Sequence, residues 1–253
     1  RNDFGGDIPG WGYSESPLID GDRLICTPGA RDAMLAALDK NTGEVIWKTP
    51  VDQSLSGGAA YSSIVKTSGG GVEQYVQLVG RGVIGVAAED GTLLWSYTRI
   101  ANGTANIPTP IVTGDYVFTS TGYGDGGTAL LELKPAGRGK VKMREVYYLS
   151  SNEVQNHHGG MVLIGDYVYL GHGHGSGFPL CLELKTGREV WKDRGAGGGS
   201  AARWTRCCRT SRSSARWRRS GLRTSTRIGW QTRPSRPTCG RTLRHQSASA
   251  TWS

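Results

Sequence analysis

The sequence predicts an all-β fold made of repeated four-stranded antiparallel units, and three observations lead to this prediction. A glycine stands four residues before each of three tryptophans, in the pairs Gly43/Trp47, Gly91/Trp95 and Gly187/Trp191. These tryptophans are 48 and 96 residues apart, so the second interval is twice the first and contains one degenerate copy. A period in the forties is typical of stacked or radial repeats. The 39 glycines and 3 phenylalanines among 253 residues also favour a turn-rich β protein.

A second motif precedes the glycine and tryptophan pairs and locates the strands of each unit. Gly-Asp followed by alternating apolar residues, at Asp22, Asp115 and Asp166, predicts a turn and then a strand. Asp22 and Asp166 each stand 25 residues before the tryptophan of their unit. In the first unit we expect strands at about residues 14–19, 23–27, 34–39 and 44–48. The glycine at 43 closes the last hairpin, and strict alternation would put Val45 and Trp47 on one face.

The matched spacings predict four units, at about residues 12–50, 58–97, 107–148 and 159–192, within a repeat region of residues 1–200. In the third unit residues 135–139 replace the usual turn, which accounts for its missing tryptophan. A four-stranded sheet of this size cannot bury both faces, so each unit must pack on the next. This organisation is that of a β-propeller with about four blades, a partial ring. A β-sandwich with coincidental turns is the alternative, but it does not explain the matched offsets.

Residues 201–253 have a different composition from the repeats. They contain 13 arginines and no lysine, aspartate or glutamate, which leaves 17 of the 30 basic residues and all 21 acidic residues in positions 1–200. The net charge of +9 therefore does not indicate a nucleic-acid partner for the repeats. We expect this tail to be disordered or to be out of frame, because few apolar residues are available to form a core. A basic arm with interleaved tryptophans that binds nucleic acid is the alternative.

The cysteines and the apolar runs give weaker information. Cys26 and Cys181 lie in the repeats and three cysteines lie in the tail, which is not a disulfide framework. No run of eighteen apolar residues exists, so we expect no transmembrane segment. The chain begins at Arg1, as a fragment or a processed form does. We expect a monomer.

The segment Ala37-Leu38-Asp39-x-x-Thr42-Gly43-x-x-x-Trp47 resembles the repeat of pyrroloquinoline-quinone-type (PQQ-like) β-propellers. The resemblance covers about residues 10–200. It implies a tryptophan that docks between neighbouring blades, in propellers that usually have six to eight blades. Such repeats also resemble those of bacterial propeller proteins, among them the lipoprotein of outer-membrane β-barrel assembly.

This resemblance implies an exported, non-catalytic scaffold of the periplasm or cell envelope, which binds a protein or a small polar ligand and needs no cofactor. The alternative that it implies is an enzyme, a fragment of a PQQ-dependent alcohol or sugar dehydrogenase, with PQQ and Ca²⁺ as cofactors. In that family two adjacent cysteines often form a disulfide over the quinone. Cys207 and Cys208 match this feature in sequence only, and they lie beyond the recognisable repeats. We therefore assign them no such role.

The candidate ligand-binding residues follow from the topology of a blade. The connection between blades and the loop between the second and third strands leave a blade on the same face. Four of the five histidines occur in these segments of the fourth unit, namely His157, His158, His172 and His174. Neutral imidazoles that converge there would bind a transition metal or orient a polar ligand.

Glu153 and Asn156 are the expected neighbours of these histidines. No compact ligand spacing such as HExxH is present, so the metal remains unassigned. The other interpretation is that loop histidines bond to backbone carbonyls or water. Asn102 and Asn106 occupy the matching connection before the third unit and would bind a sugar or a peptide, although Asn-Gly is first a turn signal.

Overall fold

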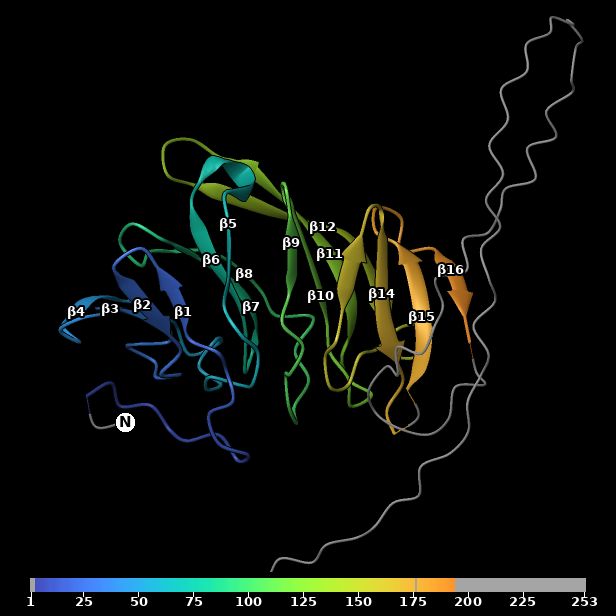
Figure 1. The fold of residues 1–253 in the computed structure, drawn as a ribbon, viewed down its shortest axis with the longest axis horizontal. Helices are drawn as coiled ribbons and strands as arrows, with labels where there is room; N and C mark the ends of the chain where they lie inside the picture. The colour runs from blue at the N-terminus through green and yellow to red at the C-terminus, as the bar shows by residue number, and fades with distance from the viewer. Residues whose placement is uncertain (1–2, 176, 194–253) are drawn as a thin grey trace, which may run out of the picture. The chain divides into compact units, whose positions relative to one another are not determined.

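The structure is a computed structural model that describes residues 3–175 and 177–193. The arginine-rich tail at 201–253 and the pair Cys207 and Cys208 lie outside the described residues, so the predictions made for them stay predictions. The described residues form four separate four-stranded antiparallel sheets, coloured from blue to orange along the chain in Figure 1. The fold-class prediction is confirmed by these four sheets.

We call the sheets blades 1 to 4. Blade 1 consists of β1 (Leu18–Asp20), β2 (Arg23–Cys26), β3 (Ala36–Asp39) and β4 (Val45–Lys48). Blade 2 consists of β5 (Val65–Thr67), β6 (Gln74–Val79), β7 (Gly82–Ala87) and β8 (Leu93–Tyr97), and a short 3₁₀ turn, η1 (Gly69–Gly71), joins β5 to β6. Blade 3 consists of β9 (Ile111–Thr113), β10 (Tyr116–Ser120), β11 (Gly127–Pro135) and β12 (Val141–Ser150). Blade 4 consists of β13 (Val162–Ile164), β14 (Tyr167–His172), β15 (Phe178–Glu183) and β16 (Glu189–Lys192).

Within each blade the strands pair in chain order, so every hydrogen-bonded neighbour is also a neighbour in sequence. The first strand of blade 1 begins at Leu18, later than the expected Ser14, because the preceding residues bond outside the sheet. Glu15 Oε1 accepts a hydrogen bond from the backbone N–H of Thr27 at 2.7 Å, and the N–H of Ser16 donates to Ser63 Oγ at 3.0 Å. No helix among the described residues is long and apolar enough to cross a bilayer.

The hairpin between β3 and β4 differs from the sequence prediction in one detail that decides how blades pack. A bulge shifts the register between Ala37 and Leu38, so Trp47 pairs with Ala37 while Val45 pairs with Leu38. Ala37 belongs to the core between blades 1 and 2, and Trp47 faces the same core. The expectation that Val45 and Trp47 share a face is therefore wrong. The bulge inserts one residue, and Val45 points to the other side of the sheet.

Three apolar clusters join the blades in chain order. The first joins blades 1 and 2 and contains Trp47, Tyr75, Ile25, Met34 and Ile84. The second joins blades 2 and 3 and contains Trp95, Tyr97, Val117, Ala129 and Leu131. The third joins blades 3 and 4 and contains Phe118, Leu130, Val168, Leu170 and Leu182. Neighbouring sheets thus bury the apolar sides that face each other, as the period predicts.

The tryptophan of β4 docks on the glycine turn of the following blade. A Cβ atom built on Gly91 would lie 2.6 Å from Cε3 of Trp47, so only a glycine leaves room for the indole. Gly91 also has φ of +77°, which L-residues with a side chain rarely adopt. The hydroxyl of Thr49 donates to the carbonyl oxygen of Gly91 at 2.9 Å and holds the turn against β4.

Blade 3 lacks the tryptophan but keeps a ring in its place. A Cβ atom on Gly187 of blade 4 would lie 2.9 Å from Cε2 of Tyr147, a residue of β12. The Tyr147 hydroxyl donates to the carbonyl oxygen of Leu184 at 2.9 Å. The degenerate repeat therefore forms the same junction with a tyrosine, which the glycine and tryptophan motif alone does not reveal.

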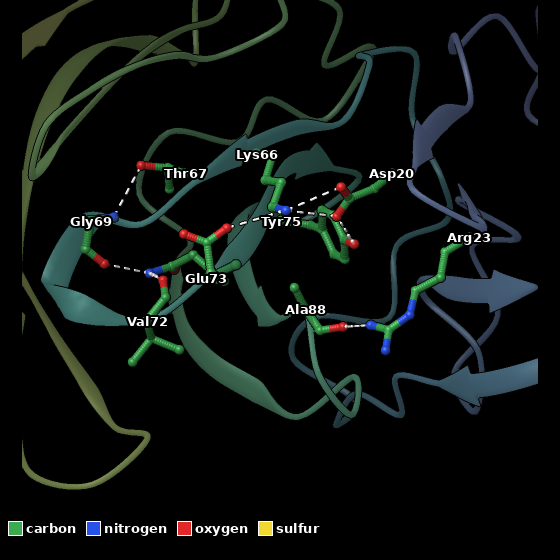
Figure 2. Close-up of polar contacts among 10 residues, drawn as sticks. Asp20, Arg23, Lys66, Thr67, Gly69, Val72, Glu73, Tyr75 and Ala88 are labelled. Atoms are coloured by element: carbon green, nitrogen blue, oxygen red, sulfur yellow. Dashed lines mark hydrogen bonds and ion pairs between the residues drawn. The ribbon is translucent and has the colours of Figure 1, made fainter.

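Polar contacts reinforce the junction of blades 1 and 2 on the rim that carries the hairpin turns (Figure 2). The carboxylate of Asp20 pairs with Lys66 Nζ at 2.8 Å and accepts a hydrogen bond from the Tyr75 hydroxyl at 2.7 Å. The Lys66 ammonium and the Tyr75 hydroxyl hold the pKa of Asp20 below its usual range. The guanidinium of Arg23 donates to the backbone carbonyl of Ala88. These polar contacts between four side chains hold blades 1 and 2 in one position relative to each other.

Candidate ligand-binding loop face

The connections between blades and the loops between second and third strands all leave the blades on one side. We call this side the loop face. A cavity of about 460 Å³ opens on this face at blades 1 and 2. Its walls come from Gly5 and residues 7–10, 29–31, 56–61 and 102–106, together with Gly80. Eleven of its twenty lining residues are glycine or alanine. The walls of the cavity are therefore formed largely by backbone.

Close approach between loops explains why glycine is needed at this site. A Cβ atom on Gly80 would lie 1.8 Å from the carbonyl oxygen of Gly57, and one on Gly29 would lie 2.3 Å from the amide nitrogen of Ala59. Neither contact is possible for a larger residue without a shift of the backbone. The glycines thus bring the loops of blades 1 and 2 together around the cavity. The charged side chains of its lining are Asp7 and Arg31.

Asn102 and Asn106, both predicted as ligand-binding residues, line this cavity and are buried. Asn102 Nδ2 donates to the carbonyl oxygen of Ala105 at 2.7 Å, and its Oδ1 accepts from the N–H groups of Thr104 and Ala105. Asn106 Nδ2 donates to the carbonyl oxygen of Gly80 at 3.0 Å, and its Oδ1 accepts from the N–H of Asn102. Both amides are engaged with the backbone that they shape. They support the wall of the cavity, as the turn interpretation expects.

The equivalent place on blades 3 and 4 is filled by aromatic rings. The ring of His157 lies 4.0 Å from that of His158 and 4.2 Å from that of His174, measured between centroids. Tyr123, from the loop between β10 and β11, lies 4.4 Å from His157 and 5.1 Å from His174. We call these four residues the histidine cluster. It brings together three of the four predicted histidines.

His157 is the buried member of the histidine cluster, with 7 % of its surface exposed. Neither of its ring nitrogens has a hydrogen-bond partner among the described residues. Burial, together with the neighbouring imidazoles of His158 and His174, lowers the pKa of His157 to about 4. The ring is therefore neutral at pH 7 and packs as an aromatic group.

The remaining predicted residues act on the backbone around the histidine cluster. Asn156 Nδ2 donates to the carbonyl oxygens of Gly159 and Gly171, while its Oδ1 accepts from the N–H of Gly159 at 2.6 Å. His172 Nδ1 accepts from the N–H of Gln155 at 3.2 Å. These contacts fasten the connection between blades 3 and 4 to the end of β14.

Glu153 lies in the same connection, but its carboxylate accepts from the N–H and the hydroxyl of Ser150, at 2.9 and 2.8 Å. These hydrogen bonds lower the pKa of Glu153. Within residues 3–175 and 177–193, no group of three or more His, Cys, Asp or Glu side chains is arranged to hold a metal ion. The rings of the histidine cluster contact one another instead.

Two parts of the loop face were not singled out by sequence reasoning. Tyr123 lies in a glycine-rich loop and has φ of +63°, a strained value for a tyrosine that its packing against His157 and His174 maintains. The segment 5–10, which precedes the first repeat, closes one side of the cavity. A tyrosine between glycines in the loop between β10 and β11, on the predicted ligand-binding face, was the available signal for Tyr123. No motif marks the second.

Comparisons with known proteins agree with this architecture. The family model described as outer membrane protein assembly factor BamB matches residues 4–193. The crystal structure of quinohemoprotein alcohol dehydrogenase from Comamonas testosteroni is similar with a TM-score of 0.50 and 13% identity, over 72% of this chain and 35% of that chain. Quinohemoprotein alcohol dehydrogenase ADHIIG from Pseudomonas putida HK5 gives a TM-score of 0.54 and 15% identity, over 74% of this chain and 34% of that chain.

At such identities the likeness to the two dehydrogenases shows the fold alone. This chain spans about a third of the length of each of them. No curated protein sequence matches the chain. The family model, in contrast, matches well over half of the chain and includes every strand of the four blades. The chain therefore belongs to the family of the outer membrane protein assembly factor BamB.

Proposed function

We propose that the chain is a non-catalytic scaffold of the cell envelope, which binds an extended segment of a partner protein on its loop face. The observation that carries this proposal is the cavity at blades 1 and 2, whose lining is mostly glycine and alanine. Such walls present backbone N–H and C=O groups to a ligand. An extended peptide that adds to a sheet edge binds through main-chain hydrogen bonds, with small pockets for alternate side chains, and we propose that the loop backbone of this cavity is used in the same way.

Membership of the assembly-factor family supports the compartment and the class of partner. The description of the family names the outer membrane. Strands of outer-membrane barrels alternate apolar and polar residues, and before they insert they are extended segments with unpaired backbone groups. A backbone-lined cavity about 460 Å³ in volume suits a few residues of such a segment. We propose on the same ground that the protein is exported to the cell envelope.

The quinoprotein alternative requires a site for PQQ and Ca²⁺, and the lining of the loop-face cavity offers few ligands for one. Calcium takes six to eight oxygen ligands, mainly carboxylates and carbonyls. The cavity lining contains one carboxylate, Asp7, and the amides of Asn102 and Asn106 are already bonded to backbone. We therefore propose that the scaffold works without a quinone.

The test of the scaffold uses a fluorescein-labelled synthetic peptide of about ten residues with alternating apolar and polar side chains, the length of one barrel strand. Fluorescence anisotropy should show saturable binding to the full chain. Gly103→Trp should weaken it about tenfold, equivalent to about 1.4 kcal/mol, because the indole would occupy the cavity. A Cβ atom on Gly103 meets only Asp125 Oδ2 at 3.5 Å, an ordinary contact, so the fold should tolerate the change.

Ser68→Trp is the matched control, since Ser68 is exposed on the opposite rim. It should leave the affinity unchanged. Absence of binding by the unmodified chain, or an equal loss in both variants, would refute the proposed site. Reduction of an artificial electron acceptor after addition of PQQ and Ca²⁺ would instead establish the dehydrogenase alternative.

A further inference from the structure

Two junctions of the chain share one geometry, in which a ring from the last strand of a blade lies on the turn glycine of the next. Trp47 lies on Gly91 and Tyr147 lies on Gly187. The turn glycines have φ of +77° and +70°. Gly43 of blade 1 forms the same turn, with φ of +77° and its N–H bonded to the Asp39 carbonyl, yet no atom of residues 3–175 and 177–193 lies within 4 Å of its Cβ position. Blade 1 thus presents a turn glycine on which no ring of the described residues is docked.

Blade 4 presents the complementary half of such a junction. Trp191 occupies the position in β16 that Trp47 has in β4, and both stand opposite the strand residue that precedes a bulge. Trp47 is buried with 8 % of its surface exposed, whereas Trp191 is half-buried and lies against Tyr169 of its own blade. The last strand of blade 4 therefore carries a docking tryptophan whose acceptor turn is not among the described residues.

The surface around Trp191 corresponds to the surfaces that contact the next blade elsewhere. Tyr167 follows the Gly-Asp motif as Arg23 and Tyr116 do in blades 1 and 3. Arg23 donates to Ala88 of blade 2, and the ring of Tyr116 lies 3.7 Å below Lys185 Nζ of blade 4. Tyr167 is 38 % exposed, and Ile164, its cross-strand partner, is 58 % exposed.

The outer face of blade 1 is apolar in the same way. Val45 corresponds to Leu93 of blade 2, which packs into the core between blades 1 and 2. Val45 is 46 % exposed and pairs across the sheet with Leu38. The same cross-strand row continues through Leu24 to Ile19, which is 55 % exposed. Exposed apolar rows of this kind mark interaction surfaces.

We propose that blade 4 of one chain docks on blade 1 of a second copy, with Trp191 against Gly43. The contact continues the junction that already repeats inside the chain, and the apolar rows of Ile164 and Val45 become its core. Blade 4 of each chain meets blade 1 of the other, so the pair has a twofold axis. The two contacts together join the eight described blades of the two chains.

Light scattering coupled to size-exclusion chromatography tests this pairing with the full chain. The unmodified protein should elute with twice the 27.1 kDa mass of one chain. Val45→Glu and Ile164→Glu should each halve the measured mass, because a carboxylate in an apolar junction is costly to desolvate. Both side chains are exposed in the single chain, so neither change should disturb its fold. Lys142→Glu, on the exposed side of blade 3, is the control and should keep the double mass.

Mixing the two variants gives the decisive measurement. The Val45→Glu chain retains an intact blade 4 and the Ile164→Glu chain an intact blade 1, so an equimolar mixture should form a one-to-one complex through one junction. A single-chain mass for the unmodified protein would overturn the proposal. That result is also the one expected if another part of the same chain covers these two faces. A double mass that survives both substitutions would overturn it as well, because the pair would then use another surface.

Discussion

The junction of blades 1 and 2 and the junction of blades 3 and 4 are built on the same plan but differ on the loop face. Both place a ring on a turn glycine, Trp47 on Gly91 and Tyr147 on Gly187. At the first junction glycine and alanine loops surround a cavity. At the second, the equivalent loops carry the histidine cluster, whose rings pack against one another in edge-on and tilted arrangements.

This difference teaches that the strands set the packing while the loops set what each junction offers to a ligand. The hollow junction exposes backbone, and the filled junction exposes imidazole and phenol edges. A ligand that bonds to main-chain groups should therefore prefer blades 1 and 2. Four comparisons of paired variants test how far the two junctions really correspond.

The largest effect is expected from removal of the docking rings. Trp47→Ala should destabilise the protein by about 3–5 kcal/mol, because it leaves a large cavity in a fully packed core. Tyr147→Ala should cost less, about 2 kcal/mol, since Tyr147 is only partly buried. Urea unfolding followed by circular dichroism measures both. A Tyr147→Ala variant that is as unstable as Trp47→Ala would show that the two junctions depend equally on their rings.

The histidine cluster predicts a loss of stability between pH 6.5 and pH 4. His157 has a folded-state pKa of about 4, below the ordinary value of 6.5, so the unfolded chain binds its proton first. Stability due to the neutral ring is complete above pH 6.5 and is lost as the pH falls towards 4, by up to about 3 kcal/mol. His157→Phe keeps a buried ring without a titrating group.

The stability difference between the unmodified protein and His157→Phe should therefore change between pH 7 and pH 4. Thermal unfolding at several pH values measures it. Parallel pH profiles for the unmodified protein and His157→Phe would contradict the assignment.

The turn glycines provide a smaller, steric comparison. Gly91→Ala and Gly21→Ala both place a side chain at positive φ, +77° and +61°. Only Gly91 also brings a Cβ atom within 2.6 Å of the Trp47 ring, whereas Gly21 has open space. Gly91→Ala should therefore cost about 1–3 kcal/mol more than Gly21→Ala. Equal losses would mean that backbone strain alone explains the glycine.

The smallest effect is expected from single hydroxyl groups at the two junctions. Tyr147→Phe removes the hydrogen bond to the Leu184 carbonyl and should cost about 1 kcal/mol. Tyr75→Phe removes the bond to the charged carboxylate of Asp20 and should cost somewhat more, about 1.5 kcal/mol. Chemical denaturation with matched buffers is accurate enough to compare them. A larger loss in Tyr147→Phe would reverse the order that charge assistance predicts.

The repeat motif was sufficient to predict the sheets because its information is local. Gly43 and Trp47 belong to one hairpin, and the segment from Asp22 to Trp47 lies within one blade. The sequence pattern is therefore no longer than the structural unit that it predicts. The face of Val45 could not be predicted, because the bulge at Ala37 and Leu38 changes the alternation without leaving a sequence mark. The fold class followed from the sequence, while the detailed register did not.

The candidate site was predicted less completely, because it depends on loops from different blades. His157, His158 and His174 were expected on one rim and lie together. Their partner Tyr123 comes from another blade, and no local pattern connects it to them. The burial of Asn102 against its own loop backbone is likewise a product of packing. The role of these residues in binding stays a prediction.

The pairing of strands in strict chain order has a consequence for how the molecule comes apart. Each blade closes its hydrogen bonds with residues near in sequence and touches the other described blades through its neighbours alone. Cooperativity in such an array is transmitted only from one unit to the next, as in a one-dimensional chain of coupled elements. An end blade has one coupling where an inner blade has two, so amide hydrogens in blades 1 and 4 should exchange with solvent before those in blades 2 and 3. A partner that covers the outer faces of blades 1 and 4 would then slow the unfolding of all the described blades.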